Sequence, residues 1–462
     1  MAQHTYATVT DKLVTEAEMQ ARSQGGRMSI LVAVGTRPEA IKMIPVVRAL
    51  QESNDFCPVV VSTGQHAQLV DQLFGQAGLR IDANLHAGRK EYGIAPTLNQ
   101  MVARIILGID RLWNEQALPS DLAANGHRDP RGAIACLVHG DTSSAAAAAL
   151  AAFNLQLPVV HVEAGLRTSN LMEPFPEEGN RQIISRLAAV HFAPTSANKA
   201  NLIREGVDFD RIVVTGNTSI DMLRHAAEHE GGFGPGLEPL EADSTRRLVL
   251  VTAHRRENWG EGLERIAAAV QTLADRHPEA DFVVPMHPNP TAREALNSAL
   301  HDRENAYLVE PREYFDFMRL VSRSTLIITD SGGVQEEAPA LGIPVLVTRS
   351  VTERSEGVKA GTLTLVGTDH DTIVTTAERV LGCSDEQLAV RRASAPQNPY
   401  GDGHAAERIV TALTQIRWGG PMPDLFEGET LRQAVFRHIG RADVPQRKPL
   451  RTGEDDTAGV IQ

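Results

Sequence analysis

The segment SILVAVGTRPEAIK, from Ser29 to Lys42, sets the fold class of this chain of 462 residues. It begins as a run of aliphatic residues, passes through Gly35 and continues into a charged stretch with Pro38, which is favoured in the first turn of a helix. A buried parallel strand that ends at a glycine and leads into a helix is typical of an open α/β sheet. Ligands of such sheets lie where strand ends meet helix N-termini, so Arg37 and Lys42 are candidates for binding an anion.

The same alternation of apolar runs and helical patterns continues along the chain, and it predicts βαβ units with right-handed crossovers. Six strands are expected in the first half, namely SILVAVGT, CPVVVSTG, IACLVHGD, PVVHVEAG, VHFAPT and RIVVTGN. Six more follow a glycine-rich stretch at 230–244, namely RLVLVTAH, DFVVPMH, NAYLVE, TLIITDS, IPVLVTR and TLTLVG. We therefore predict two Rossmann-like, doubly wound parallel-sheet domains at 28–216 and 217–400, with the active site in the cleft between them. Residues 1–27 and 419–462 are expected to be extensions, the second with one helix at about 429–438.

Composition excludes several classes of function. The formal net charge of −13 argues against a general nucleic-acid binder, although a local cationic pocket for a small anion can exist in an acidic protein. No apolar stretch reaches the length needed to span a bilayer, and the first 27 residues contain no signal core, so no membrane partner is expected. Cys57, Cys136 and Cys383 form neither a disulfide framework nor a zinc spacing, which favours a reducing cytoplasm.

Two strand ends carry acids that could perform proton transfer. Asp141 and Glu163 each lie two residues after a histidine, His139 and His161, and strand alternation would place each histidine on the same face as its acid. Such pairs could ligate a metal, or they could be structural or acid/base groups. The sequence EPFPEEGNR adds Glu177, either as a further acid or as a charge that stabilises a helix N-terminus.

The second half carries candidate phosphate-binding groups. In DSGGVQEEA, Ser331, Gly332 and Gly333 could cradle a diphosphate, although a simple helix cap explains the serine equally well. One of the two glutamates that follow could accept ribose hydroxyls. His254 and His287 end two further strands, where they could stabilise a leaving phosphate or lie at the surface. There is no Walker loop and no G-x-S-x-G nucleophile turn.

Taken together, these segments resemble the non-hydrolysing UDP-N-acetylglucosamine 2-epimerases of bacteria, from about residue 29 to about residue 415. The matching segments are GTRPEAIKM, GQH, HGDTSS, HVEAGLRT, PFPEEGNR, TGNTSID, TAHRREN, HPNP, TDSGGVQEEAP, GIPVLVTR, TERSEGV, AGT and NPYGDG. The resemblance implies a GT-B fold, a C-terminal helix at 401–418 that crosses back to the first domain, and a homodimer. It also implies that no metal or NAD cofactor is needed.

The activity that the resemblance implies is the interconversion of UDP-GlcNAc and UDP-ManNAc through elimination of UDP to 2-acetamidoglucal and its re-addition. By motif, Asp141, Glu163 and Glu177 match the acid/base carboxylates, and His254 matches a histidine near the diphosphate. The residues matched to substrate and UDP binding are Arg37, Lys42, His287, Ser331, Gly332, Gly333, Glu337 and Arg354. Those matched to an allosteric site for a second UDP-GlcNAc are Gln65, Gln68 and Arg255.

Four other functions stay open on the same scaffold. The chain could epimerise a modified UDP-sugar, or hydrolyse UDP-GlcNAc to free ManNAc. It could also be a GT-B glycosyltransferase, which would leave C2 of the sugar untouched, or a non-catalytic sensor, which would be expected to lack one of the three matched carboxylates. The stretch LHAGRKEYGIAPT, from Leu85 to Thr97, departs from the usual family pattern, and it is expected near the allosteric and sugar pockets.

Overall fold

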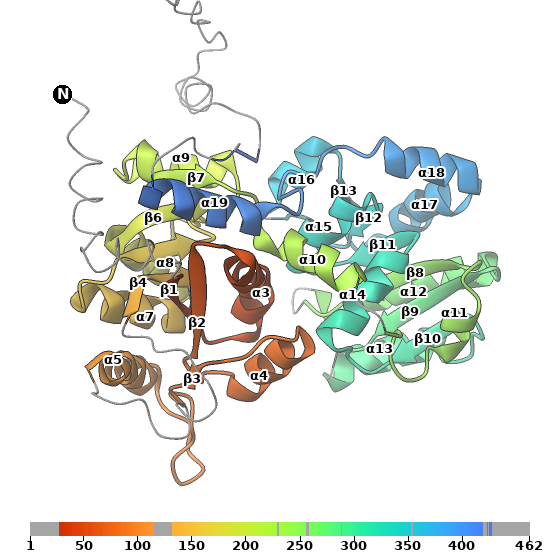
Figure 1. The fold of residues 1–462 in the computed structure, drawn as a ribbon. Helices are drawn as coiled ribbons and strands as arrows, with labels where there is room; N and C mark the ends of the chain where they lie inside the picture. Colours follow the sequence, from red (N-terminus) through yellow and green to blue (C-terminus); the bar gives the residue numbers. More distant parts are fainter. Residues whose placement is uncertain are drawn as a thin grey trace, which may run out of the picture.

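The computed structural model describes residues 27–114, 132–228, 231–255, 258–287, 289–352, 354–418, 423, 425 and 426. It shows two α/β lobes, each built on one parallel sheet (Figure 1). The predicted fold class is therefore confirmed. The expectations for residues 1–26 and for a helix at 429–438 lie outside the described residues.

The first lobe contains a seven-stranded parallel sheet in the order β3-β2-β1-β4-β5-β6-β7. Its strands are β1 Met28–Val34, β2 Phe56–Ser62, β3 Ala83–Asn84, β4 Ala133–His139, β5 Val159–Val162, β6 Ala188–Ala193 and β7 Ile212–Val214. Both faces are buried: Val32 packs into one hydrophobic cluster and Leu31 into another. The strand order reverses between β1 and β4, and this reversal is where an open sheet forms a binding crevice.

Six α-helices are described in the first lobe, and the first of them begins two residues after Gly35, as the sequence predicts. They are α3 Arg37–Glu52, α4 Ala67–Gln76, α5 Leu98–Asn114, α7 Ser143–Asn154, α8 Glu177–Leu187 and α9 Ser196–Arg204, with the short 3₁₀ helix η2 Phe209–Arg211. Thr36 and Glu39 form a capping box at the start of α3. A side chain at Gly35 would place its Cβ 2.3 Å from Ser144 Oγ, so only glycine lets β1 end this close to α7.

The second lobe contains a six-stranded parallel sheet in the order β10-β9-β8-β11-β12-β13. Its strands are β8 Arg247–Thr252, β9 Ala280–Pro285, β10 Ala306–Val309, β11 Leu326–Thr329, β12 Val345–Val347 and β13 Leu363–Leu365. Its helices are α11 Glu238–Ala242, α12 Glu261–Arg276, α13 Pro290–Leu300, α14 Tyr314–Arg323, α15 Gly332–Glu337, η4 Ala338–Leu341, α16 Ser355–Ala360, α17 His370–Leu381 and α18 Asp385–Ala393. All twelve expected strands are present, and the two-residue strand β3 is the addition.

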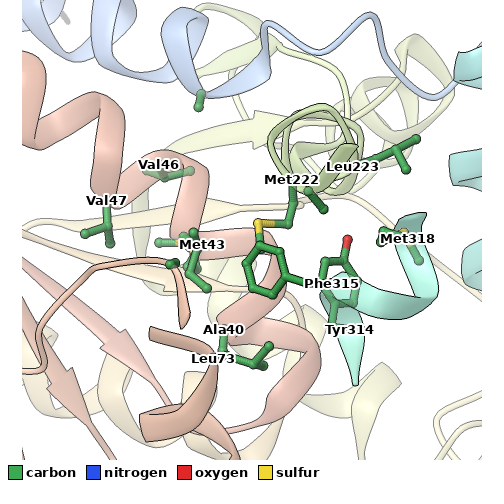
Figure 2. Packing of buried hydrophobic residues seen from close by; sticks show 14 of the residues in the cluster. Ala40, Met43, Val46, Val47, Leu73, Met222, Leu223, Tyr314, Phe315 and Met318 are labelled. Atoms are coloured by element: carbon green, nitrogen blue, oxygen red, sulfur yellow. The ribbon is translucent and has the colours of Figure 1, made fainter. Parts of the chain in front are cut away.

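Two crossings of the chain join the lobes. The first leads from β7 into α10 Thr218–Glu228, and the second leads into α19 Ala405–Trp418, which lies against the first lobe (Figure 1). The crossings meet where the Asn217 N–H donates to the Tyr400 carbonyl at 2.7 Å. Apolar side chains of α3, α10 and α14 pack together at this junction, with Met43, Met222 and Phe315 among them (Figure 2). The exact domain boundaries stay predictions.

Phe426 packs onto this junction after α19 ends. Its ring is 5% exposed and would lie 3.5 Å from a Cβ placed on Gly216, while the Arg408 guanidinium is 5.7 Å from the ring centre. The Phe426 N–H donates to the Val214 carbonyl at 3.2 Å. Phe426 therefore ties the chain beyond α19 to the end of the last strand of the first sheet.

We expect Phe426→Ala to lower the free energy of unfolding by about 3 kcal/mol, because it removes a buried ring and leaves a cavity. Urea unfolding of the full chain measures this. Phe209→Ala is the matched control, because the Phe209 ring is 50% exposed and its loss should change stability by less than about 0.5 kcal/mol. Equal effects of the two substitutions would mean that Phe426 does not pack at the junction in solution.

No helix among the described residues is both long enough and apolar enough to cross a membrane. The three cysteines all lie within the described ranges, and none forms a disulfide.

Candidate active site

Glu163 lies at the centre of a buried charge cluster at the end of β5. Its carboxylate forms a close ion pair with Lys42 of α3, and it lies 3.7 Å from His139 Nε2. Burial alone would raise the pKa of Glu163, but Lys42 and His139 lower it to about 2. Burial likewise opposes the charge on Lys42, yet Glu163 raises its pKa above the ordinary value. Both groups are therefore charged at neutral pH.

The two His-x-acid pairs do not keep the strand alternation expected from the sequence. β4 and β5 end before their acids, and Gly140 and Glu163 turn the chain with φ of 66° and 62°. As a result His139 of the first pair lies beside Glu163 of the second, and His161 Nε2 lies 2.7 Å from the Gly140 carbonyl. Burial lowers the pKa of both histidines to about 4, so they are neutral at pH 7.

The two His-x-acid pairs do not form a recognisable metal-binding site among the described residues. Across the part of the chain that the structure describes, no three histidine, cysteine, aspartate or glutamate side chains come together as metal ligands. A Cβ placed on Gly140 would lie 3.3 Å from Glu163 Oε2, so the turn that carries Asp141 borders the Glu163 carboxylate. The arrangement favours two neighbouring acid/base groups at the carboxyl edge of the sheet.

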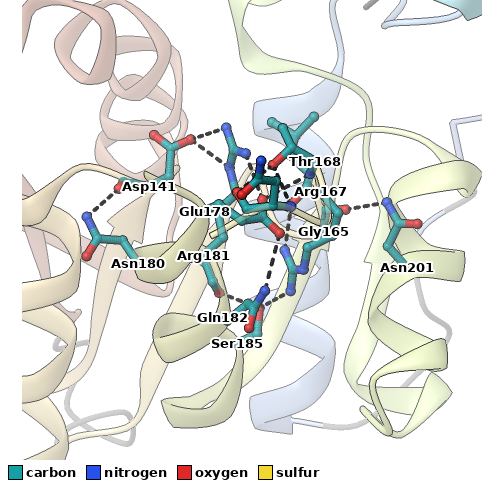
Figure 3. Close-up of polar contacts among 12 residues, drawn as sticks. Asp141, Gly165, Arg167, Thr168, Glu178, Asn180, Arg181, Gln182, Ser185 and Asn201 are labelled. Carbon is teal, nitrogen blue, oxygen red and sulfur yellow. Dashed lines mark hydrogen bonds and ion pairs between the residues drawn. The ribbon is translucent and has the colours of Figure 1, made fainter. Parts of the chain in front are cut away.

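Asp141 is held by α8 through an arginine that the sequence analysis did not single out. Its Oδ2 accepts from Arg181 Nε at 2.8 Å and lies 2.6 Å from a terminal guanidinium nitrogen (Figure 3). The same guanidinium donates to the buried Glu178 at 3.0 Å, and Asn180 Nδ2 donates to the Asp141 carbonyl at 2.9 Å. Arg181 follows Glu178 by three residues in EPFPEEGNR, and this helical spacing is the signal that could have identified it.

Glu177 is the first residue of α8, one helical turn before Arg181. Its Oε2 is buried and has no hydrogen-bond partner among the described residues. A buried carboxylate oxygen without a donor is costly, and a ligand hydroxyl or amide would satisfy it. If Glu177 only stabilised the N-terminus of α8 by its charge, the burial of this oxygen without a donor would have no explanation.

In the second lobe, the buried Asp330 orients His254. Asp330 directly follows β11 and lies 3.0 Å from His254 Nδ1, and it also accepts from the backbone N–H of His254 and Arg255 and from Asn258 Nδ2. Burial alone would raise the pKa of Asp330, but these hydrogen bonds lower it. The His254 ring stacks on His287 with the ring centres 6.3 Å apart. The His254 side chain is 39% exposed.

A cavity of about 220 Å³ opens beside this histidine pair. Such a volume suits one ring of a ligand rather than a complete sugar nucleotide. The side chains that line it include His254, Met286, His287, Arg312, Phe317 and Ser331. Phe317 was not predicted, because the pattern of α14 indicates an amphipathic helix and does not show which side chains reach a cavity. Arg312 was not predicted either, because it lies in the loop before α14, where no pattern marks it.

The turn after β11 brings the remaining predicted residues together. Ser331 occupies the N-cap position of α15, but its hydroxyl makes no capping hydrogen bond, so the cap reading of this serine is not realised. A Cβ on Gly332 would lie 3.0 Å from the Arg354 guanidinium, whereas at Gly333 the nearest atom would be Glu337 Oε2 at 3.9 Å. Arg354 Nε donates to Glu336 at 2.9 Å.

Glu337 leads to a prediction on pH, because burial and the neighbouring Glu336 raise its pKa to about 8. A carboxyl whose pKa is higher in the folded state favours folding below its ordinary pKa of 4.5 and loses that contribution as pH rises through about 8. We expect Glu337→Gln to unfold at a higher temperature than the wild type above pH 8, with the gap shrinking as pH falls. Calorimetric scans across this pH range measure it, and a gap independent of pH would show that Glu337 does not titrate there.

Arg37 is the first residue of α3 and faces the second lobe. Tyr314 of α14 has a raised pKa, caused by burial and by Glu337, and the charge of Arg37 counteracts this rise. Arg37 makes no hydrogen bond or ion pair with the described residues. Its guanidinium is thus free to bind an anion between the lobes.

The residues expected at an allosteric site lie on both lobes. Gln65 follows β2 and accepts from Ser144 Oγ at 2.7 Å, Gln68 is exposed in the first turn of α4, and Arg255 donates its N–H to Asp330 at 2.9 Å. The unusual stretch 85–97 packs on the Gly64–Gln65 turn, where the Gly88 N–H donates to the Gly64 carbonyl at 3.1 Å. It therefore borders the predicted allosteric residue Gln65.

Comparison with known proteins identifies relatives along almost the whole described chain. Residues 48–414 match the family model described as UDP-N-acetylglucosamine 2-epimerase. A Ralstonia nicotianae protein named as a probable UDP-N-acetylglucosamine 2-epimerase is 43% identical over 398 residues, covering 83% of this chain and 98% of the relative. The UDP-N-acetylglucosamine 2-epimerase of Escherichia coli is 42% identical over 395 residues, covering 84% of this chain and 99% of the relative.

Two solved structures share the same GT-B-like fold. The UDP-GlcNAc 2-epimerase of Neisseria meningitidis, solved with UDP-GlcNAc bound, is 37% identical with a TM-score of 0.70 and covers 84% of this chain and 100% of that chain. The S. aureus protein MnaA, solved with UDP, is 36% identical with a TM-score of 0.68 and covers 86% of this chain and 99% of that chain.

Proposed function

Because the chain belongs to the UDP-N-acetylglucosamine 2-epimerase family, we propose that it interconverts UDP-GlcNAc and UDP-ManNAc without releasing the free sugar. One observation carries this proposal: the charge cluster around Glu163 in the first lobe meets the turn after β11 in the second, where Asn217 Nδ2 donates to both Glu163 and Glu336. The link between the lobes is direct, since Lys42 interacts electrostatically with Glu336 and Glu337 as well as with Glu163. A nucleotide held by the second lobe would therefore present its sugar to the carboxylates of the first.

The second lobe is suited to bind and release the diphosphate. The 220 Å³ cavity with Phe317 would hold the base, and Glu337 would accept from the ribose hydroxyls. His254, with Nδ1 held by Asp330, would donate from Nε2 in its protonated form to the departing phosphate. Arg37 and Arg354 would offset the remaining negative charge.

The first lobe would carry the proton transfers. A hydrogen on C2 of the sugar is weakly acidic, so its loss must accompany departure of a good leaving group. One carboxylate takes the C2 proton, the C–H electrons form the C1=C2 bond of 2-acetamidoglucal, and the C1–O bond breaks with its electron pair going to UDP. Return of UDP to C1, with a proton delivered to the opposite face of C2, gives the epimer. Protonation on both faces requires more than one carboxylate, which Asp141, Glu163 and Glu177 supply.

The alternatives differ in their products. A hydrolysing enzyme would release ManNAc and UDP, and a relative with another substrate would act on a modified UDP-sugar. A glycosyltransferase would leave the C2 hydrogen in place, so it gives no use to three carboxylates at the sugar end. We also propose a homodimer and a regulatory role for Gln65, Gln68 and Arg255, by analogy with the family.

Proton NMR of the full chain with UDP-GlcNAc in deuterated water, without added metal, tests the proposal. UDP-ManNAc with deuterium at C2 is the expected product, because the proton is lost to solvent before re-addition. Free ManNAc together with UDP would establish hydrolysis instead. Binding of UDP without any turnover of UDP-GlcNAc would mean that the substrate is another UDP-sugar.

A further inference from the structure

Asn217 lies at the first crossing between the lobes, and every polar group of its side chain has a partner. Its Nδ2 donates to Glu163 Oε1 at 3.4 Å and to Glu336 Oε2 at 3.0 Å, so its two amide hydrogens serve one carboxylate in each lobe. Its Oδ1 accepts from the Ser219 N–H at 3.0 Å. The reversed amide would set its oxygen against two carboxylates and its NH₂ against an N–H donor, so the orientation is determined.

Both carboxylates that Asn217 contacts are tied to the groups that would handle the substrate. Glu163 is ion-paired with Lys42, and Glu336 accepts from Arg354 Nε at 2.9 Å. The neutral amide separates two anions that would otherwise repel each other in a buried site. Glu163 belongs to the first lobe and Glu336 to the second. The amide can therefore contact both carboxylates only while the two lobes keep the relative position seen here.

We propose that Asn217 is a positioning residue that aligns Glu163 for proton transfer and couples this alignment to the nucleotide-binding turn through Glu336. The role rests on the proposed epimerase function. Asn217 itself transfers no proton, because an amide does not titrate in the physiological range. Its contribution is to give Glu163 Oε1 a second donor beside Lys42, so that this oxygen is fixed by two donors rather than one.

An aspartate at this position gives the proposal a distinctive signature. Asn217→Asp keeps the shape but adds a third carboxyl group between Glu163 and Glu336, which raises the pKa of the new group. When protonated it can still donate one hydrogen bond, whereas when ionised it repels both neighbours. Charged or titratable groups around it, beyond the two carboxylates, are Lys42, Arg354, His139, Glu337 and Tyr400.

The experiment compares epimerisation by the wild type and by Asn217→Asp and Asn217→Ala at about pH 6 and about pH 9. We expect Asn217→Ala to lower kcat about 30-fold at both values with KM changed less than about 3-fold. The kcat of Asn217→Asp should be about 300-fold below that of the wild type at the higher pH. At the lower pH the difference in kcat should be smaller by at least about 10-fold. Asn198→Asp is the control, since the buried Asn198 side chain caps α9 by accepting from Thr195 and has no hydrogen bond to Glu163 or Glu336, so kcat should be unchanged.

Thermal unfolding supplies a readout that does not depend on activity. The gap in unfolding temperature between the wild type and Asn217→Asp should widen as pH rises, because the third carboxylate is then ionised. A gap that does not change with pH, or a loss of UDP affinity in Asn217→Ala as large as its loss of kcat, would overturn the proposal. A wild type without epimerase activity would refute the proposed function. The unfolding comparison would still decide whether the side chains at positions 163, 217 and 336 lie in contact.

Discussion

Glu163→Gln is expected to lower kcat by about 1,000-fold or more while UDP still binds, because a carboxamide cannot accept the C2 proton. The substitution keeps the shape of the side chain, but it leaves the half-buried Lys42 without its ion-pair partner. Coupled enzymatic measurement of UDP-ManNAc formation gives kcat, and isothermal titration with UDP gives the affinity.

The same variant has a second expected effect, on stability. The pKa of Glu163 is about 2 in the folded protein, below its ordinary value of 4.5, because Lys42 and His139 outweigh the effect of burial. The ionised group therefore stabilises the fold above about pH 4.5, and this contribution is lost as pH falls toward 2. Glu163→Gln should unfold at a lower temperature than the wild type at neutral pH, with a smaller difference in acid.

Glu205→Gln is the matched control for this loss of activity. Glu205 is also a carboxylate of the first lobe in an ion pair, at 2.7 Å from Arg167, but it lies at the end of α9 and contacts none of the acid/base residues. It should turn over at close to the rate of the wild type. Wild-type turnover in Glu163→Gln itself would remove Glu163 from the chemistry.

Asp141→Asn is expected to lower kcat by about 1,000-fold, again with UDP binding retained. The asparagine can still accept from Arg181 through its oxygen, so α8 should stay in place. Under the proposed function, what is lost is the capacity of this side chain to gain and lose a proton at C2 of the sugar. Deuterium incorporation at C2, followed by NMR without net turnover, measures whether one of the two proton transfers survives.

Asp281→Asn is the control for Asp141→Asn. Asp281 is buried in β9 of the second lobe and accepts from Arg246 Nε at 3.0 Å. It therefore has the same kind of aspartate–arginine contact as Asp141, but outside the candidate site. It should cost stability without lowering kcat. If both aspartate variants lose activity in proportion to their loss of stability, Asp141 acts only through its contact with Arg181.

Most of the fold was predictable because burial has a simple sequence signature. Most strands are buried on both faces, and such strands have continuous Val- and Ile-rich sequences. The twelve apolar runs found in the sequence correspond to twelve strands. The addition, β3, is two residues long and falls below the length at which any pattern can be recognised. The helices followed from the glycine, proline and threonine residues at their starts, which are local signals.

The candidate site was predictable in its members but less so in its contacts. Asp141, Glu163, His254 and Ser331 were expected at strand ends, and the structure places them there. The partners that control them were missed: Arg181 on Asp141, Asp330 on His254, and Asn217 between Glu163 and Glu336. Phe317 was missed for a different reason, since an aromatic residue on an amphipathic helix is normally part of the core.

Local patterns along the chain thus established the sheets, the helix starts and the chemical types of the residues at the strand ends. They could do so because strand and helix formation depend on neighbours within a few residues, and burial imposes its period directly on the sequence. The contact of His139 with Glu163 and the cavity beside His254 came only from the tertiary packing within each lobe, and the bridge through Asn217 came only from the packing of the two lobes against each other. Lys42 and Glu163 lie 121 residues apart, and no periodicity over a few residues can specify a contact across that separation.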